Sequence, residues 1–161
     1  MRNGERLNPA RTQPKLRRPN GLPLAAGRMP TNRRATTPVL DLSFDADALL
    51  RLRSAVGAYA AELGAGGRLE DIVLIAHELA SNAVRHGGGS GRLRLWRDDF
   101  LLFCRVSDSG PGLSDAARAG VELPSPEVPG GRGLWLARRL AAVRIDTGRT
   151  GTTITAAITL P

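Results

Sequence analysis

The stretch 71–87, DIVLIAHELASNAVRHG, constrains the fold more than any other part of the sequence. At 3.6 residues per turn its apolar residues gather on one broad helical face, which a globular domain has to bury. These residues are Ile72, Ile75, Ala76, Leu79, Ala80 and Ala83. Glu78 and Asn82 lie one turn apart at the edge of that face. The stretch therefore predicts a central helix with a core face and a polar edge that looks into a pocket.

The residue types at this polar edge allow two interpretations. With phosphate groups nearby, Glu78 can act as a general base and the carboxamide oxygen of Asn82 can hold a hard cation. A Glu and an Asn at helical spacing are also common on a solvated flank, and the pair alone favours that interpretation. On the polar side of the same helix, we expect His77 to be a plain surface histidine and His86-Gly87 to end the helix.

Composition limits the class of protein. The chain has 161 residues, of which 42% are hydrophobic, and this predicts one soluble domain with a short appendage. No apolar run approaches the ~20 residues of a membrane span, and the N-terminus has no hydrophobic signal core. The single cysteine, Cys104, excludes an internal disulfide and lies in the apolar run FLLFCRV, which predicts a buried thiol. We therefore expect a cytoplasmic protein without membrane contact.

The net charge of +8 is carried by one end of the chain. Residues 1–38 hold nine Lys or Arg and one Glu, whereas 39–161 hold fourteen basic and fourteen acidic residues. Residues 1–38 contain six prolines and have no apolar periodicity, which predicts a disordered basic tail. An alternative is that translation begins at Met29, which would remove most of this tail. Such a tail can hold nucleic acid, membrane phosphate or an acidic partner loosely. A solvated, dispensable tail is the interpretation we prefer.

Residues 39–161 have the pattern of a two-layer α+β domain. Alternating apolar and polar residues predict strands at 39–44, 92–97, 100–107, 143–146 and 152–160, and helical periodicity predicts helices at 46–63, 68–86 and 134–142. Asp45 is expected to be the N-cap of the first helix, and Asp98-Asp99 the turn of a hairpin. Each helix has one apolar stripe, so all three should cover one face of a mostly antiparallel sheet of four to five strands. Residues 113–129 lack periodicity and predict a lid or a disordered loop.

Two glycine-rich segments stand at the ends of predicted elements. Asp108-x-Gly110-x-Gly112 follows a strand, so a carboxylate begins a turn whose backbone a ligand can approach closely. An Asp-Gly turn without a ligand is the simpler interpretation of this segment alone.

The second glycine-rich segment, Gly130-Gly131-Arg132-Gly133, begins a helix. Free N–H groups, the positive end of the helix dipole and a guanidinium group together favour an anion site there. A plain glycine-rich helix start is the alternative. Neither segment fits the Walker phosphate loop or the Rossmann fingerprint.

The order of these features resembles the GHKL superfamily of ATP-binding domains, which includes gyrase, heat-shock chaperones, histidine kinases and anti-sigma-factor kinases. The likeness covers 39–161: a helical Glu-x-x-x-Asn, a strand-end Asp-x-Gly-x-Gly, a long loop, a glycine-rich helix start and a terminal Gly-Thr-Thr. The segments HELASNAVRHG and GTTITAAITLP in a one-domain chain look most like the stand-alone anti-sigma regulatory serine/threonine kinases of actinobacterial type. The resemblance implies the Bergerat-type α+β sandwich, with ATP and Mg²⁺ as ligands.

The resemblance also implies roles for residues around the base and the metal. Asn82 looks like the asparagine that holds Mg²⁺, and Glu78 like the general base that accepts the proton of the attacking group. Asp108 matches the aspartate that accepts a hydrogen bond from the adenine amino group. Gly110 and Gly112 match the glycines that shape the adenine pocket.

Further roles are implied for the C-terminal part of the domain. Gly131 and Gly133 match the glycines that wrap the phosphates, and Arg132 is expected to be an additional phosphate contact. Thr153 lies near the position where the family has a hydroxyl beside the adenine.

The function implied is an ATP-dependent serine/threonine kinase that regulates a sigma factor and phosphorylates an anti-anti-sigma protein. No phosphoacceptor segment precedes 39–161 and no transducer domain follows it, so we do not expect a sensor histidine kinase or a gyrase. The first alternative is a non-catalytic module that sequesters a partner when ATP is bound. The second is nucleic-acid binding through the basic tail, which is disfavoured because the folded part is neutral and poor in aromatic residues. A homodimer is compatible with each of these functions.

Overall fold

The computed structural model describes residues 40–125, 127 and 131–161. The strands are β1 (Leu40–Asp45), β2 (Ser90–Asp98), β3 (Leu101–Ser107), β4 (Ala142–Gly148) and β5 (Gly151–Thr159). The helices are α1 (Leu49–Glu62), α2 (Leu69–His86) and α3 (Arg132–Leu140), and a 3₁₀ turn, η1 (Gly66–Arg68), precedes α2. The tail 1–38 lies outside the described residues, so its disorder stays a prediction.

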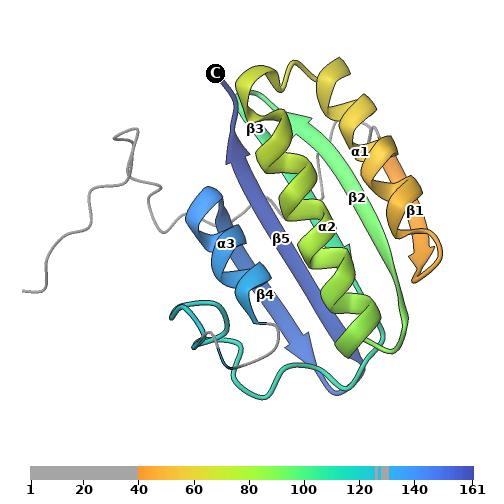
Figure 1. Ribbon diagram of the computed structural model, residues 1–161, viewed down its shortest axis with the longest axis vertical. Helices are drawn as coiled ribbons and strands as arrows, with labels where there is room; N and C mark the ends of the chain where they lie inside the picture. The colour runs from red at the N-terminus through yellow and green to blue at the C-terminus, as the bar shows by residue number, and fades with distance from the viewer. Residues whose placement is uncertain (1–39, 126, 128–130) are drawn as a thin grey trace, which may run out of the picture. The chain divides into compact units, whose positions relative to one another are not determined.

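The strands form one antiparallel sheet in the order β1-β2-β3-β5-β4. Helices α1, α2 and α3 cover one face of this sheet (Figure 1). This confirms the predicted two-layer α+β fold, in which every helix has one apolar stripe to bury. Because β5 lies between β3 and β4, the end of β3 is paired with the beginning of β5, and Ser107 is opposite Thr153.

The predicted core face of α2 is buried against the sheet. Ile72, Ile75 and Leu79 are each at most 1% exposed, and they belong to the same core as Leu93 and Cys104 of the neighbouring strands. Truncation of such a buried Leu or Ile to Ala costs about 2–5 kcal/mol. The predicted burial of Cys104 is confirmed, and this burial raises the pKa of its thiol to about 12 because the thiolate would lose its hydration.

Two element ends near aspartates differ from the prediction. Helix α1 begins at Leu49 rather than at 46, and its N-cap residue is Ala48. The predicted N-cap, Asp45, instead closes the preceding turn, where its Oδ1 accepts a hydrogen bond from Ala48 N at 3.1 Å. In the β2–β3 hairpin Asp98 pairs with Leu101, so the turn lies one residue later than predicted, and Asp99 takes a positive φ of 54°.

Helix α3 also differs from its predicted bounds, 134–142. It begins at Arg132, and it ends at Leu140 because Ala141 is extended, with φ −144° and ψ 164°. Ala142 already pairs with Ala157 as the first residue of β4. Pairing with the sheet therefore overrides the helical periodicity of these alanines.

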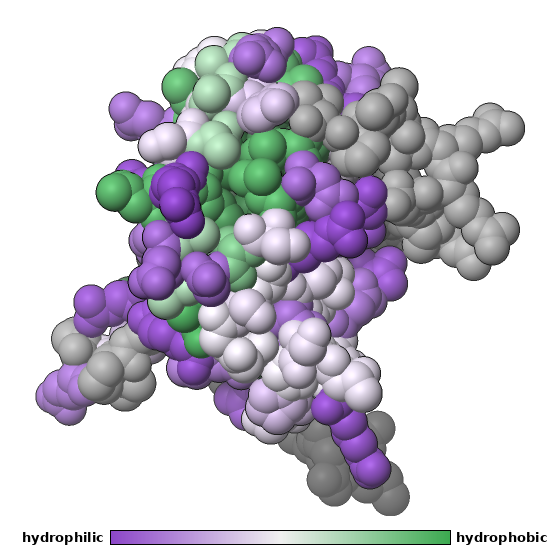
Figure 2. All heavy atoms as spheres, turned by 90° about the vertical axis from the view of Figure 1, so that its right-hand side faces the viewer, coloured by the Kyte–Doolittle hydropathy of each residue, from purple (hydrophilic) through white to green (hydrophobic). Residues whose placement is uncertain are grey.

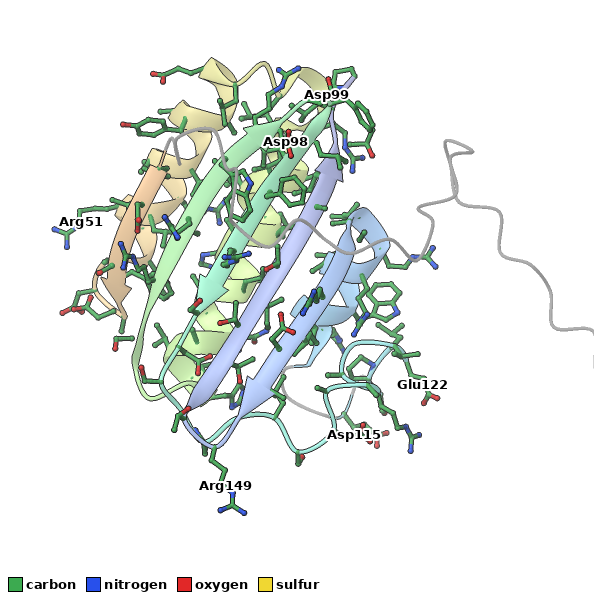
Figure 3. All side chains as sticks on the ribbon, turned by 180° about the vertical axis from the view of Figure 1, so that it is seen from behind. Arg51, Asp98, Asp99, Asp115, Glu122 and Arg149 are labelled. Atoms are coloured by element: carbon green, nitrogen blue, oxygen red, sulfur yellow. The ribbon has the colours of Figure 1, made fainter. Side chains whose placement is uncertain are left out.

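The face of the sheet that the helices do not cover carries aromatic and basic side chains (Figure 3). Trp96 and Phe103 stack there with their ring centroids 5.1 Å apart, and the guanidinium of Arg105 lies 5.1 Å from the Trp96 ring.

On the side of α1 and β1, apolar areas are bordered by hydrophilic residues (Figure 2). Leu50 of α1 is 77% exposed. No described helix combines the length and the apolar character that crossing a membrane requires.

Candidate functional site

The end of α2 is in contact with the turn that follows β3. A Cβ on Gly110 would lie 2.5 Å from Gly87 Cα, and a Cβ on Gly87 would overlap the side chain of Asp108. Gly87 has a φ of −101°, so glycine is needed here for close packing rather than for a left-handed turn. This contact brings the helix that carries Glu78 and Asn82 to the Asp108 carboxylate.

The carboxylate of Asp108 is held by two backbone amides. Its Oδ1 accepts hydrogen bonds from Gly110 N at 3.0 Å and from Thr152 N at 3.1 Å. The backbone N–H of Asp108 also donates to Thr152 O at 2.9 Å, which fixes the residue to the start of β5. No described residue donates to Oδ2, so this half-buried carboxylate keeps one fixed oxygen that can accept from a ligand.

Gly112 packs against the β4–β5 hairpin. It has a φ of 84°, and a Cβ there would overlap the carbonyl oxygen of Gly148 and lie 3.0 Å from Thr147 Oγ1. Only glycine allows this backbone path without strain. Gly110 and Gly112 therefore shape the turn beside Asp108, and their expected role in an adenine pocket stays a prediction.

Helix α3 begins beside Glu78. Gly131 is the N-cap residue with a φ of 77°, and no side chain caps the helix among the described residues. Gly133, in the first turn, is buried, and a Cβ there would overlap Oε2 of Glu78. The uncapped N–H groups and the dipole make this helix start suitable for an anion. Arg132 is exposed in the same turn, whereas Gly130 lies outside the described residues.

Asn82 is half-buried one turn after Glu78, and its Oδ1 accepts a hydrogen bond from Arg85 Nη2 at 3.3 Å. The described residues contain no group of three or more His, Cys, Asp and Glu side chains that could hold a metal ion. A cation here would therefore need phosphate and water oxygens beside the carboxamide. Mg²⁺ usually binds in this way, so the donor set fits it.

Thr153 does not lie with the other predicted site residues. Its hydroxyl is 3.0 Å from Ser107 Oγ, on the face of the sheet opposite to the core residues Val106 and Ile154. The hydroxyl on the Asp108 side belongs to its neighbour, Thr152, which is 6% exposed. Thr152 was not among the predicted site residues, because two neighbouring threonines cannot be assigned to a face of β5 without the register of the sheet.

His77 is partly buried, which corrects the expectation of a plain surface histidine. Its Nε2 lies 3.5 Å from Ser81 Oγ, and its buried Nδ1 has no hydrogen-bond partner among the described residues. His77 precedes Glu78 by one position, and Ser81 precedes Asn82 in the same way. Because successive helical residues point in different directions, His77 and Ser81 lie on another flank of α2 than Glu78 and Asn82. Neither reaches the carboxylates of the site through a hydrogen bond that the structure shows.

The described part of the predicted lid packs on α3 without forming a helix or strand. Ala119 O accepts a hydrogen bond from Arg138 Nε at 2.8 Å, and Gly120 packs against Leu134. Asp115 and Glu122 project from this segment (Figure 3). Its first residue, Leu113, donates its N–H to Thr147 Oγ1 at 2.9 Å, so the segment is tied to the β4–β5 hairpin next to Asp108.

Residues 42–158 match a family model described as histidine kinase-like ATPase domain. No curated protein matches the chain. The family match covers nearly all of the described residues, including every site residue discussed above.

Solved structures of histidine kinases are similar in part. The histidine kinase domain of the blue-light activated histidine kinase of Erythrobacter litoralis is 23% identical with a TM-score of 0.49; the match covers 71% of this chain and 60% of that one. The Acinetobacter baumannii histidine kinase AdeS is 13% identical with a TM-score of 0.46, and the match covers 77% of this chain and 69% of that one. The histidine kinase domain of the E. coli osmosensor EnvZ is 17% identical (TM-score 0.44), with 81% and 93% covered.

Proposed function

Because this chain belongs to the histidine kinase-like ATPase family, we propose that it binds ATP between α2, α3 and the end of β3. The observation that carries this proposal is the Asp108 carboxylate, whose Oδ1 is saturated by two backbone N–H groups. Its Oδ2 can accept a hydrogen bond from the exocyclic amino group of adenine. Guanine presents a carbonyl oxygen at that position, which a carboxylate repels, so the site should select ATP over GTP.

The start of α3 is suited to the phosphates. No side chain of the described residues caps the N–H groups around Gly131 and Gly133, and the helix dipole favours negative charge there. Arg132 is exposed in the first turn and supplies a guanidinium for a terminal phosphate. Gly133 packs directly against the side chain of Glu78, which supports a carboxylate beside the phosphate chain.

Asn82 is the residue that would hold Mg²⁺, through the oxygen that accepts from Arg85 in this structure. Bound Mg²⁺ neutralises charge on the phosphates and orients them. Arg85 has to release that oxygen when a cation binds, because two cationic groups cannot share it at short distance.

The reaction we propose is transfer of the terminal phosphoryl group to a serine or threonine of a partner protein. Glu78 accepts the proton of the attacking hydroxyl as the new oxygen–phosphorus bond forms. The bond from the terminal phosphorus to the bridging oxygen breaks, and ADP leaves. The partner we propose is an anti-anti-sigma protein that controls a sigma factor, which follows from the resemblance of HELASNAVRHG and GTTITAAITLP to the anti-sigma regulatory kinases.

Two measurements test this function. Calorimetric titration with ATP, with and without Mg²⁺, should show saturable binding that Mg²⁺ strengthens, and GTP should bind weakly. Incubation with labelled ATP and purified partners encoded near the gene should then label a serine or threonine.

Each part of the proposal has an outcome that contradicts it. A wild-type protein that does not bind ATP overturns the nucleotide site. Binding of ATP without labelling of any partner, together with tighter partner binding in its presence, replaces the kinase by a partner-sequestering module. Label found on a histidine would contradict serine/threonine specificity.

A further inference from the structure

Two threonines join the start of the 113–125 segment to Asp108. Thr147 of β4 and Thr152 of β5 are opposite each other in the strand pair, with their Oγ1 atoms 3.0 Å apart. Thr147 Oγ1 also accepts the hydrogen bond of Leu113 N at 2.9 Å. On the other side, the backbone N–H of Thr152 donates to Asp108 Oδ1. Thr152 therefore connects the 113–125 segment to the carboxylate through two of its groups, the hydroxyl that contacts Thr147 and the backbone N–H that donates to Asp108.

The backbone path at Gly112 constrains these hydrogen bonds. Gly112 passes so close to the hairpin that its Cβ would lie 3.0 Å from Thr147 Oγ1 and would overlap Gly148 O. Leu113 therefore has little freedom to present its N–H in any other direction. Thr147 itself is exposed, whereas Thr152 is buried, so the outer hydroxyl can be changed without opening the core.

Either hydroxyl can be the donor in the bond between the two threonines, and the direction decides which hydrogen is left for a ligand. A hydroxyl has one hydrogen to donate and two lone pairs with which to accept. In the arrangement we infer, Thr147 accepts from Leu113 N and donates its own hydrogen to Thr152 Oγ1. The hydrogen of the Thr152 hydroxyl is then free to point at an acceptor atom of a ligand beside Asp108.

We propose that Thr147 is a positioning residue for recognition of the nucleotide base, and that it couples this recognition to the 113–125 segment. The inference rests on the proposed ATP site. Asp108 supplies an acceptor and Thr152 a donor, which match the amino group and the neighbouring ring nitrogen on the edge of adenine. Thr147 orients the hydroxyl of Thr152. Its hydrogen bond to Leu113 N holds the start of the 113–125 segment in place while the nucleotide is bound.

The test compares Thr147→Val, which keeps the shape but loses the hydroxyl, with Thr147→Ser, which keeps the hydroxyl. Thr150→Val is the matched control, because Thr150 is exposed in the same hairpin and its hydroxyl makes no hydrogen bond among the described residues. Affinities for ATP and GTP are measured by titration of the full chain, and thermal unfolding is measured in parallel. Loss of one hydrogen bond should weaken ATP binding by about 3–10-fold in Thr147→Val. The affinity of Thr147→Val for GTP should stay close to that of the wild type. The affinities of Thr147→Ser and Thr150→Val for ATP should also stay close to the wild-type value.

Hydrogen exchange at the Leu113 amide provides a second readout. It should become faster in Thr147→Val and remain slow in Thr147→Ser, with unchanged protection in the β3 core. An equal loss of ATP and GTP affinity in Thr147→Val, or unchanged exchange at Leu113, would overturn the positioning role. A wild-type protein that does not bind ATP would instead overturn the proposed function, and the two failures are therefore distinguishable.

Discussion

The carboxylate of Glu78 packs against Gly133 and occupies the space that a side chain at position 133 would need. The proposed base and the proposed phosphate site thus come from α2 and α3 and meet directly. Helices α2 and α3 pack beside each other over the sheet, so these two groups are held next to each other (Figure 1).

Gly133→Ala should separate these two parts of the site. The added methyl overlaps Glu78 Oε2 and lies 3.0 Å from Glu78 Cβ, so either the carboxylate or the first turn of α3 has to shift. A misplacement of about 1 Å lowers phosphoryl transfer by ~10²-fold. Gly67→Ala is the control, since a Cβ there has nothing within 4 Å. Wild-type transfer rates in Gly133→Ala would contradict this assignment.

Gly110→Ala should destabilise the whole domain. The new Cβ meets backbone atoms, Gly87 Cα at 2.5 Å and His86 O at 3.0 Å, which cannot rotate away as a flexible side chain does. Overpacking of this kind costs about 1–3 kcal/mol in the free energy of unfolding. Urea denaturation measures it against Gly67→Ala. Equal midpoints for the two variants would show that the end of α2 and the turn after β3 are free to separate.

Asp108→Asn should lower ATP affinity while preserving the fold. The carboxamide oxygen can still accept from Gly110 N and Thr152 N, but the second oxygen is replaced by an amino group that faces the amino group of adenine. A weakening by about 10–100-fold is expected from the lost acceptor and the donor–donor contact. Titration with ATP and GTP measures this effect. Unchanged ATP affinity would remove Asp108 from base recognition.

Glu78→Gln and Asn82→Ala should separate chemistry from binding. Glutamine cannot take a proton, so transfer should fall by ~10²–10⁴-fold while ATP binds nearly as in wild type. Asn82→Ala removes the oxygen proposed to hold Mg²⁺, so ATP affinity should lose its dependence on Mg²⁺. Labelled-ATP transfer and titrations at two Mg²⁺ concentrations distinguish the effects. Full transfer by Glu78→Gln would refute the general-base role.

Cys104 should be unreactive in the folded protein and should affect its stability at high pH. Burial raises the pKa of its thiol from 9.0 to about 12. Between these values the unfolded thiol loses its proton and the folded one keeps it, so the free energy of unfolding falls as pH rises through this range. A thiol reagent at pH 8 should label the native protein far more slowly than the urea-unfolded protein. Rapid labelling of the native state would show that β3 opens readily.

Local sequence patterns were sufficient for the type and order of the elements and for a set of candidate site residues. The apolar periodicity of 71–87 predicted α2 and the edge that carries Glu78 and Asn82, and alternation predicted the strands. Asp108 and the glycines after it were noted as a turn at a strand end, and their expected roles came from the resemblance to the GHKL superfamily. These features depend on residues that are neighbours along the chain, so the sequence by itself determined them.

Contacts between distant segments decided the rest. Alternation along β5 does not say which face is the core, so only pairing with β3 shows that Thr152 rather than Thr153 lies beside Asp108. Gly87 and Gly133 look like ordinary glycines at helix ends, and their need to be glycine comes from Asp108 and Glu78, which approach from other elements. Periodicity is a property of one segment, whereas strand register and close packing are fixed only when segments meet. The tertiary structure alone therefore assembled the site.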